Sequence, residues 1–199
     1  MSEQQTRIGS VQRTTLETDI SVALTLDGTG QTMIDSDVPF LDHMLTLFGV
    51  HGFFDLIVNG KGDVQVDDHH TVEDVGICLG KAFREALGDF TGIARYGECC
   101  LPMDETLVRV VVDISNRPFL HYNVAVSDSR IGSFDTALAK EFLRAFAQHA
   151  GVTLHVDLLH GENSHHIIEA VFKGLGRAMR QAVGEMHGIR GALSSKGCL

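Results

Sequence analysis

A segment of twenty residues occurs twice in this chain. Residues 69–88, HHTVEDVGICLGKAFREALG, align without a gap with residues 165–184, HHIIEAVFKGLGRAMRQAVG, and ten of the twenty positions are identical. Identity at this level and in strict register indicates an internal duplication. A duplicated chain builds one structural unit twice, so each element expected in one half should have a counterpart in the other.

The predicted elements follow the same order in both halves. Apolar residues recur at helical spacing in both copies of the repeat, and each copy ends at a glycine, so each copy is a predicted helix. An amphipathic helix and runs that alternate like strands precede each copy. The other expected helices are residues 39–52 and 135–151, and the expected strands are residues 21–30, 53–60, 63–68, 106–115, 119–126 and 152–159. This order predicts an α+β fold made of two similar halves.

The boundary between the halves is expected near residues 87–97. We predict a first structural repeat over residues 1–92, a second over residues 93–187, and a C-terminal tail over residues 188–199 that contributes to the substrate site. No low-complexity linker separates the halves, so they are expected to pack together as one compact domain.

Charge and apolar content argue against several classes of partner. The formal net charge of −10 argues against nucleic acid as a partner. No apolar run approaches the ~18 residues that cross a membrane, and the N-terminus lacks an apolar leader segment. The four cysteines form no C-x-x-C pair, which is typical of free thiols in a reducing cytosol. We therefore expect a cytoplasmic protein that binds neither nucleic acid nor membranes.

Each copy of the repeat begins with His-His-x-x-Glu, in a chain that has eleven histidines. Successive helical residues are about 100° apart, so His69 lies within about 40° of Glu73, and His70 lies about 60° away on its other side. The second copy has the same side chains at His165, His166 and Glu169. Because the two histidines of a pair point apart, we predict two metal ions, each taking one histidine from each helix. Surface histidines and an ordinary glutamate pair are the alternative for one copy, but two copies in register favour metal binding.

The repeat extends to the preceding helices, where DHMLTLF aligns with KEFLRAF. His43 then stands opposite Glu141, and both are credible metal ligands. Two alternatives remain open. His43 could be a satisfied histidine beside Asp42, and Glu141 could be a solvated helix residue beside Lys140.

The chain also contains PFLDHML, DDHHTVEDVG, PMDE, NRP, GENSHHIIEAVFK and SSKG. With these motifs, from about Arg7 to Gly197, it resembles imidazoleglycerol-phosphate dehydratase in its single-function form. The resemblance implies a hydro-lyase of histidine biosynthesis, which converts D-erythro-1-(imidazol-4-yl)glycerol 3-phosphate to 3-(imidazol-4-yl)-2-oxopropyl phosphate, imidazole acetol phosphate. It also implies halves like domain 2 of ribosomal protein S5, with helices packed on one face of four-stranded sheets.

The same resemblance implies a homo-oligomer of 24 subunits, with two manganese ions in each active site and the sites formed between subunits. Zinc or iron would also suit such donors. The eighth ligand position, a histidine in several members of the family, is Glu141 here. The metal ligands implied are His43, His69, His70, Glu73, Glu141, His165, His166 and Glu169.

The implied reaction removes a proton from a carbon that has no neighbouring carbonyl. The substrate's imidazole, held between two cations, would lose its N–H proton, and the resulting imidazolate would expel the adjacent hydroxyl to give a diazafulvene. Loss of the carbon-bound proton then forms an enol, and the resemblance makes Glu17 the base. From the residues alone Glu17 is an exposed strand residue. The other catalytic residues implied are His70, Glu73, His166 and Glu169.

The substrate phosphate requires a local basic cluster in this acidic chain. Lys173 lies four residues after Glu169 and so on the ligand face of its helix, whereas the equivalent position in the first copy is Ile77. A Glu169–Lys173 ion pair, worth roughly 0.2–0.5 kcal/mol, is the alternative interpretation. The substrate-binding residues that the resemblance implies are Glu17, His43, Arg95, Arg117, Lys173, Ser194, Ser195 and Lys196.

Two other functions remain open on the residues alone. A shell that stores or senses metal would use the paired His and Glu residues but would not need Arg117, Lys173 or Lys196. A two-metal hydrolase would use water to cleave a phosphate ester and would release inorganic phosphate.

Overall fold

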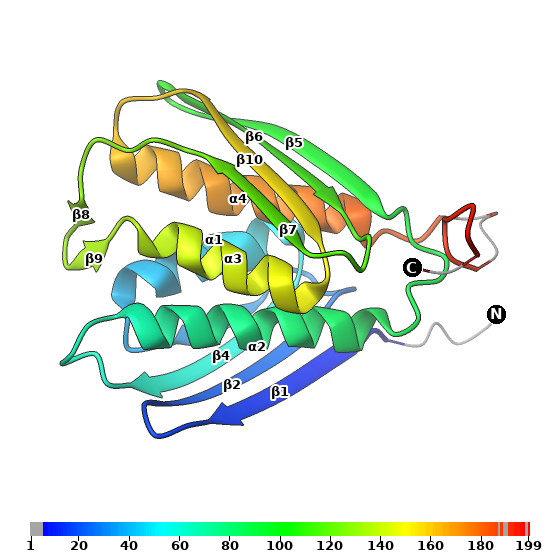
Figure 1. The fold of residues 1–199 in the computed structure, drawn as a ribbon, viewed down its shortest axis with the longest axis horizontal. Helices are drawn as coiled ribbons and strands as arrows, with labels where there is room; N and C mark the ends of the chain where they lie inside the picture. The colour runs from blue at the N-terminus through cyan, green and yellow to red at the C-terminus, as the bar shows by residue number, and fades with distance from the viewer. Residues whose placement is uncertain (1–5, 187, 189–190, 198) are drawn as a thin grey trace.

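The computed structural model describes residues 6–186, 188, 191–197 and 199. Two four-stranded sheets form the outer layers, and four helices lie between them (Figure 1). The helices are α1 (Pro39–Gly52), α2 (His69–Leu87), α3 (Leu138–Ala150) and α4 (Ser164–Ala182). The expected α+β fold, with helices on one face of each four-stranded sheet, is confirmed.

The two sheets have the same topology. The first contains β1 (Ile8–Thr14), β2 (Thr18–Thr25), β3 (Thr32–Asp35) and β4 (Asp55–Gly62) in the order β1-β2-β4-β3. The second contains β5 (Tyr96–Met103), β6 (Thr106–Asp113), β7 (Phe119–Asn123) and β10 (Thr153–His160) in the order β5-β6-β10-β7. In both, the last pair is parallel and the other pairs are antiparallel. The duplication seen in the sequence is therefore a duplication of the fold, while the boundaries at residues 92 and 187 stay predictions.

Each helix pair in the middle of the molecule joins one half to the other. Helix α2 packs on α3, and α1 packs on α4. Phe48 of α1, Phe83 of α2 and Phe146 of α3 are fully buried, and the centroid of the Phe83 ring lies 5.9 and 5.5 Å from those of the other two. The halves thus share one hydrophobic core.

Equivalent glycines of the repeat bring these helices close together. A Cβ on Gly176 of α4 would lie 2.5 Å from the carbonyl oxygen of Phe48, and one on Gly80 of α2 would lie 2.7 Å from that of Phe146. Both distances are below 3.0 Å, which real Cβ atoms essentially never show. Glycine at these positions therefore sets how closely α1 approaches α4 and α3 approaches α2.

The strand expected at residues 63–68 is wrong. The backbone N–H of Val66 donates to the carbonyl of Asp63 at 2.7 Å and closes a turn, and the N–H of Asp63 donates to the carbonyl of Glu17 at 3.1 Å. Val64 and Val66 alternate as in a strand, but Val66 is 68% exposed because no sheet face receives it. The alternation reflects a loop that bends back to the β1–β2 hairpin.

The helix expected over residues 135–151 begins at Leu138 instead. The residues before it form a small hairpin of β8 (Arg130–Ile131) and β9 (Phe134–Asp135). In the part of the chain that the structure describes, no helix has the length and apolar character needed to cross a bilayer. Cys78, Cys99 and Cys100 are free thiols, as expected, and Cys198 lies outside the described residues.

Replacing Gly176 with alanine should destabilise the protein by about 1–3 kcal/mol, although alanine is the better helix former. The added methyl group meets the backbone of α1, which cannot move away as a flexible side chain would. Urea denaturation followed by circular dichroism measures the change. Arg177→Ala, at the next and exposed position, is the control and should stay within about 0.5 kcal/mol of wild type. A Gly176→Ala variant as stable as this control would contradict the close-packing argument.

Candidate active site

The candidate metal ligands lie in the first two turns of their helices. All four helices begin at the same end of the molecule, beside the β8–β9 hairpin (Figure 1). Because α1 packs on α4 and α2 on α3, the ligands fall into two groups related by the repeat. The first group is His43 with His165 and Glu169, and the second is Glu141 with His69 and Glu73.

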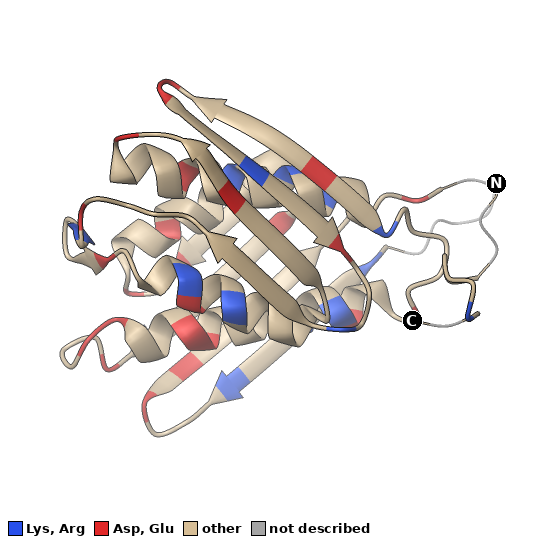
Figure 2. Cartoon of the chain, turned by 45° about the horizontal axis from the view of Figure 1, so that its top comes forward, with Lys and Arg blue, Asp and Glu red and all other residues tan. Residues whose placement is uncertain are grey.

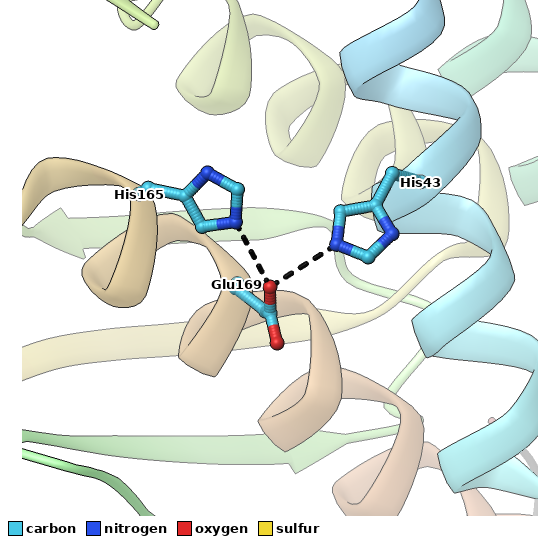
Figure 3. A group of neighbouring side chains, drawn as sticks. All are labelled: His43, His165 and Glu169. Atoms are coloured by element: carbon cyan, nitrogen blue, oxygen red, sulfur yellow. Dashed lines mark hydrogen bonds and ion pairs between the residues drawn. The ribbon is translucent and has the colours of Figure 1, made fainter.

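Three ligands of the first group converge on one point. The Nε2 atoms of His43 and His165 each lie 3.1 Å from Oε2 of Glu169, and the ligand atoms of all three lie within 4.8 Å of one another (Figure 3). Two imidazole nitrogens and a carboxylate are donors that suit manganese, zinc or iron. The residues present therefore fit a divalent metal ion.

The carboxylate of this group is buried and ionised. The side chain of Glu169 is 8% exposed, and its Oε1 lies 2.5 Å from Nζ of Lys173. Burial acts to raise the pKa of Glu169, but hydrogen bonds from Lys173, His43 and His165 outweigh burial and lower it. The ion pair that was the alternative interpretation of Lys173 is present in the chain, and it keeps Glu169 ready to bind a cation.

The second group is more open. Nε2 of His69 lies 3.8 Å from Oε2 of Glu73, and Glu141 pairs with Arg144 on its own helix. The first half has Thr46 where the second has Arg144, so His43 has no such competing partner. Among the described residues only the first group closes to metal-binding distances.

A cavity of about 520 Å³ lies beside the second group, with His69 and Glu141 in its wall. The rest of its lining is mostly polar: Asp67, Asp68, Arg130, Ser133 and Asp135, with Val64, Val66, Ala137 and Leu138. The carboxylates and the one arginine of this wall make it a polar space next to two candidate ligands.

His70 and His166, the second histidine of each pair, are each held by a carboxylate that the sequence interpretation did not assign, Asp63 for His70 and Glu105 for His166. Nδ1 of His70 lies 3.1 Å from both oxygens of Asp63 and 3.8 Å from Glu17. Nδ1 of His166 lies 2.8 Å from Oε2 of Glu105. Hydrogen bonds to these carboxylates raise the pKa of both histidines. Glu105 belongs to the PMDE motif, which was the available signal for it.

The prediction that each ion takes one histidine from each repeat helix stays a prediction, because the resemblance places the sites between subunits. Within one chain, α2 packs on α3 and α4 packs on α1. His165 therefore meets His43, not a histidine of α2. The pairing expected between the repeat helices is not made inside a single chain.

The candidate phosphate residues, apart from Lys173, lie at the other end of the molecule with the tail. The guanidinium of Arg95 donates to Asp113 at 2.7 and 3.1 Å and to the carbonyl of Leu193 at 2.6 Å, so it anchors the tail. The exposed Arg117 donates to the carbonyl of Ser115 at 3.1 Å. Figure 2 shows acidic residues at the loops and hairpin turns where the helices begin, and both basic and acidic residues beside the tail. Ser194, Ser195 and Lys196 lie in that tail.

Known proteins resemble this chain over nearly its whole length. Residues 36–179 match the family described as imidazoleglycerol-phosphate dehydratase. The imidazoleglycerol-phosphate dehydratase of Desulfotalea psychrophila is 58% identical over 196 residues, which covers 98% of each chain. That of Syntrophus aciditrophicus is 56% identical and covers 97% of this chain and 98% of the relative.

Solved structures agree with the sequence comparison. The crystal structure of the dehydratase from Staphylococcus aureus subsp. aureus N315 gives a TM-score of 0.82 at 42% identity, over 90% of this chain and 99% of that one. The structure of IGPD from Pyrococcus furiosus in complex with (S)-C348 gives 0.83 at 41% identity, over 95% and 100%.

Replacing His165 with alanine should weaken Mn²⁺ binding to this chain by more than about 10-fold, because even the outer partners of a ligand contribute 10–100-fold. Isothermal titration calorimetry measures the affinity. His155→Ala is the control, since His155 is exposed on β10 and packs beside His121 with ring centroids 5.2 Å apart. Equal Mn²⁺ affinities for the two variants would remove the first group from consideration as a metal site.

Proposed function

This chain belongs to the imidazoleglycerol-phosphate dehydratase family and is a hydro-lyase, and from that premise we propose how its side chains carry out the reaction. The reaction is the dehydration of imidazoleglycerol phosphate in histidine biosynthesis. In finer terms, the substrate is D-erythro-1-(imidazol-4-yl)glycerol 3-phosphate and the product is imidazole acetol phosphate. A cytoplasmic location suits such a small-molecule biosynthetic step.

The convergence of His43, His165 and Glu169 is the observation that carries this proposal. These donors, with those of the second group, would hold two manganese ions per active site, and zinc or iron would suit the same atoms. When bound, the ions stabilise the negative charge that the substrate's imidazole ring acquires as its N–H proton leaves. The ring can then act as the electron sink that a carbonyl provides in other dehydrations.

Glu17 is proposed as the base that moves the carbon-bound proton. Its carboxylate lies 3.8 Å from Nδ1 of the candidate ligand His70, and its side chain is 57% exposed. A carboxylate that is accessible and next to a ligand can reach both substrate and solvent, which proton transfer requires. His70, Glu73, His166 and Glu169 act beside it as ligands.

The complete site is proposed to lie between subunits of a 24-subunit assembly. Within one chain the second group stays open, and the tail lies at the opposite end from the helix N-termini (Figure 1). The acidic loops where the helices of one subunit begin (Figure 2) would attract the exposed Arg117 and Lys196 of another. This arrangement would supply the substrate phosphate with Arg95, Arg117, Lys173, Ser194, Ser195 and Lys196.

A direct assay tests the function. The full chain, loaded with Mn²⁺, is incubated with imidazoleglycerol phosphate, and the expected result is a ketone product lighter by one water in mass spectrometry. Release of inorganic phosphate would favour the two-metal hydrolase instead. Tight Mn²⁺ binding with no turnover would favour metal storage.

Replacing Lys196 with alanine should raise KM by about 10–100-fold without loss of bound metal. A charge-assisted contact to phosphate is worth about 1.5–3 kcal/mol, and Lys196 lies in the exposed tail, away from the candidate ligands. Steady-state kinetics and metal analysis of the same preparation measure both quantities. Lys81→Ala, which removes an exposed lysine of α2, is the control. A parallel fall in metal content would refute the phosphate role of Lys196.

A further inference from the structure

The second histidines of the two repeats are held in the same way by carboxylates from different places. His70 of α2 contacts Asp63, which follows β4, and His166 of α4 contacts Glu105, which is in the β5–β6 hairpin. In each case the contact is made through Nδ1, at 3.1 and 2.8 Å. The two repeats therefore make the same carboxylate–histidine contact with carboxylates from different positions in the chain.

Glu105 has a counterpart in the first half, and that counterpart is Glu17. Each glutamate directly precedes the second strand of its hairpin, and the threonines that follow, Thr18 and Thr106, are both buried. Glu17 lies 3.8 Å from Nδ1 of His70, whereas Glu105 lies 2.8 Å from Nδ1 of His166. The equivalent carboxylates therefore stand at different distances from equivalent histidines.

The second half has no carboxylate at the position of Asp63. Asp63 is the residue directly after β4, and the residue directly after β10 is Gly161. A Cβ at Gly161 would lie 2.7 Å from Oγ1 of Thr106 and 2.9 Å from Cγ1 of Ile167. A side chain at this position would have to displace Thr106 or Ile167, and in the second half it is Glu105 that contacts His166.

Glu105 is also fastened to the start of α4. Its Oε1 accepts hydrogen bonds from the backbone N–H of Glu162 at 3.2 Å and Asn163 at 2.8 Å, and from the hydroxyl of Thr106 at 3.0 Å. Asn163 in turn caps α4 by accepting the backbone N–H of His165 and His166. Oε2 is left to accept the His166 ring, so the carboxylate cannot easily turn away.

We infer that Glu105 and Asp63 are positioning residues that hold the rings of His166 and His70 by Nδ1, and that Asp63 thereby frees Glu17 to face the substrate. A carboxylate on Nδ1 fixes the proton there and leaves Nε2 without one, as a metal ligand requires. Nε2 of His166 lies 4.0 Å from Oδ2 of the exposed carboxylate of Asp104. The inference deepens the proposed function and rests on it for the role of the metal.

The test compares Mn²⁺ affinity among charge-matched variants of the full chain. Glu105→Gln keeps an oxygen for the backbone of α4 but presents a donor to His166, which favours the tautomer with a proton on Nε2. Mn²⁺ affinity should fall about 10–100-fold, and Asp63→Asn should produce a similar loss through His70. Glu17→Gln should keep its affinity within about 3-fold while kcat falls at least about 100-fold. Glu162→Gln, an exposed neighbour, is the control for charge.

Folding is monitored by circular dichroism and by the melting temperature of the metal-free variants. Asp63 does not directly precede a helix, so we expect Asp63→Asn to fold. If Glu105→Gln does not fold, Asp63→Asn alone still tests the inference. As a spectroscopic readout, the d–d absorption of bound Co²⁺ should change in Glu105→Gln and not in Glu162→Gln. A purely structural role would lower the melting temperature and leave affinity and spectrum unchanged.

Two results would overturn the inference. One is wild-type Mn²⁺ affinity in both Glu105→Gln and Asp63→Asn, and the other is an equal loss of affinity in Glu17→Gln. If the wild-type protein fails to dehydrate its substrate while the affinity pattern holds, the proposed function fails and the positioning roles stand. If the wild-type protein dehydrates its substrate but the variants do not show these changes in Mn²⁺ affinity, the proposed function stands and the positioning roles fail.

Discussion

Close contact between helices from opposite halves is the constraint on which this structure depends. Gly176 faces the backbone of α1 at Phe48, and Gly80 faces the backbone of α3 at Phe146, with no side chain between them. Each helix pair therefore contains one helix from each half. His43 reaches His165 on α4 because these backbones approach so closely. The hydrophobic core and the candidate metal site share this one geometric cause.

Duplication followed by divergence explains how two equivalent ligand groups differ. Arg144 is the repeat equivalent of Thr46 and forms an ion pair with Glu141, which leaves the second group more open than the first. Lys173 occupies the position of Ile77 and lowers the pKa of Glu169 against the opposing effect of burial. Single charged substitutions, each on a helix already in place, are enough to give equivalent sites different chemistry.

The fold class, the duplication and the types of donor atom could be predicted from the order of residues alone. Helical periodicity and ligand spacing are local properties, so residues 39–52 were predicted as a helix with the bounds that α1 has. The family motifs indicated the reaction in the same way, because a motif can be matched from the order of residues without knowing the fold. Locality also explains the failure at residues 63–68, where alternation resembled a strand but Val66 closes a turn on Asp63, whose backbone N–H donates to the distant Glu17.

Which of these residues come into contact depends on how the helices pack. The repeat did not indicate that, within one chain, α4 contacts α1, and this contact depends on packing between residues more than a hundred positions apart. Glu105 shows the same limit. Its motif was visible, but its role depends on the start of α4 lying against the β5–β6 hairpin. Spacing along the chain reports which residues share a helix face, and only packing reports what that face touches.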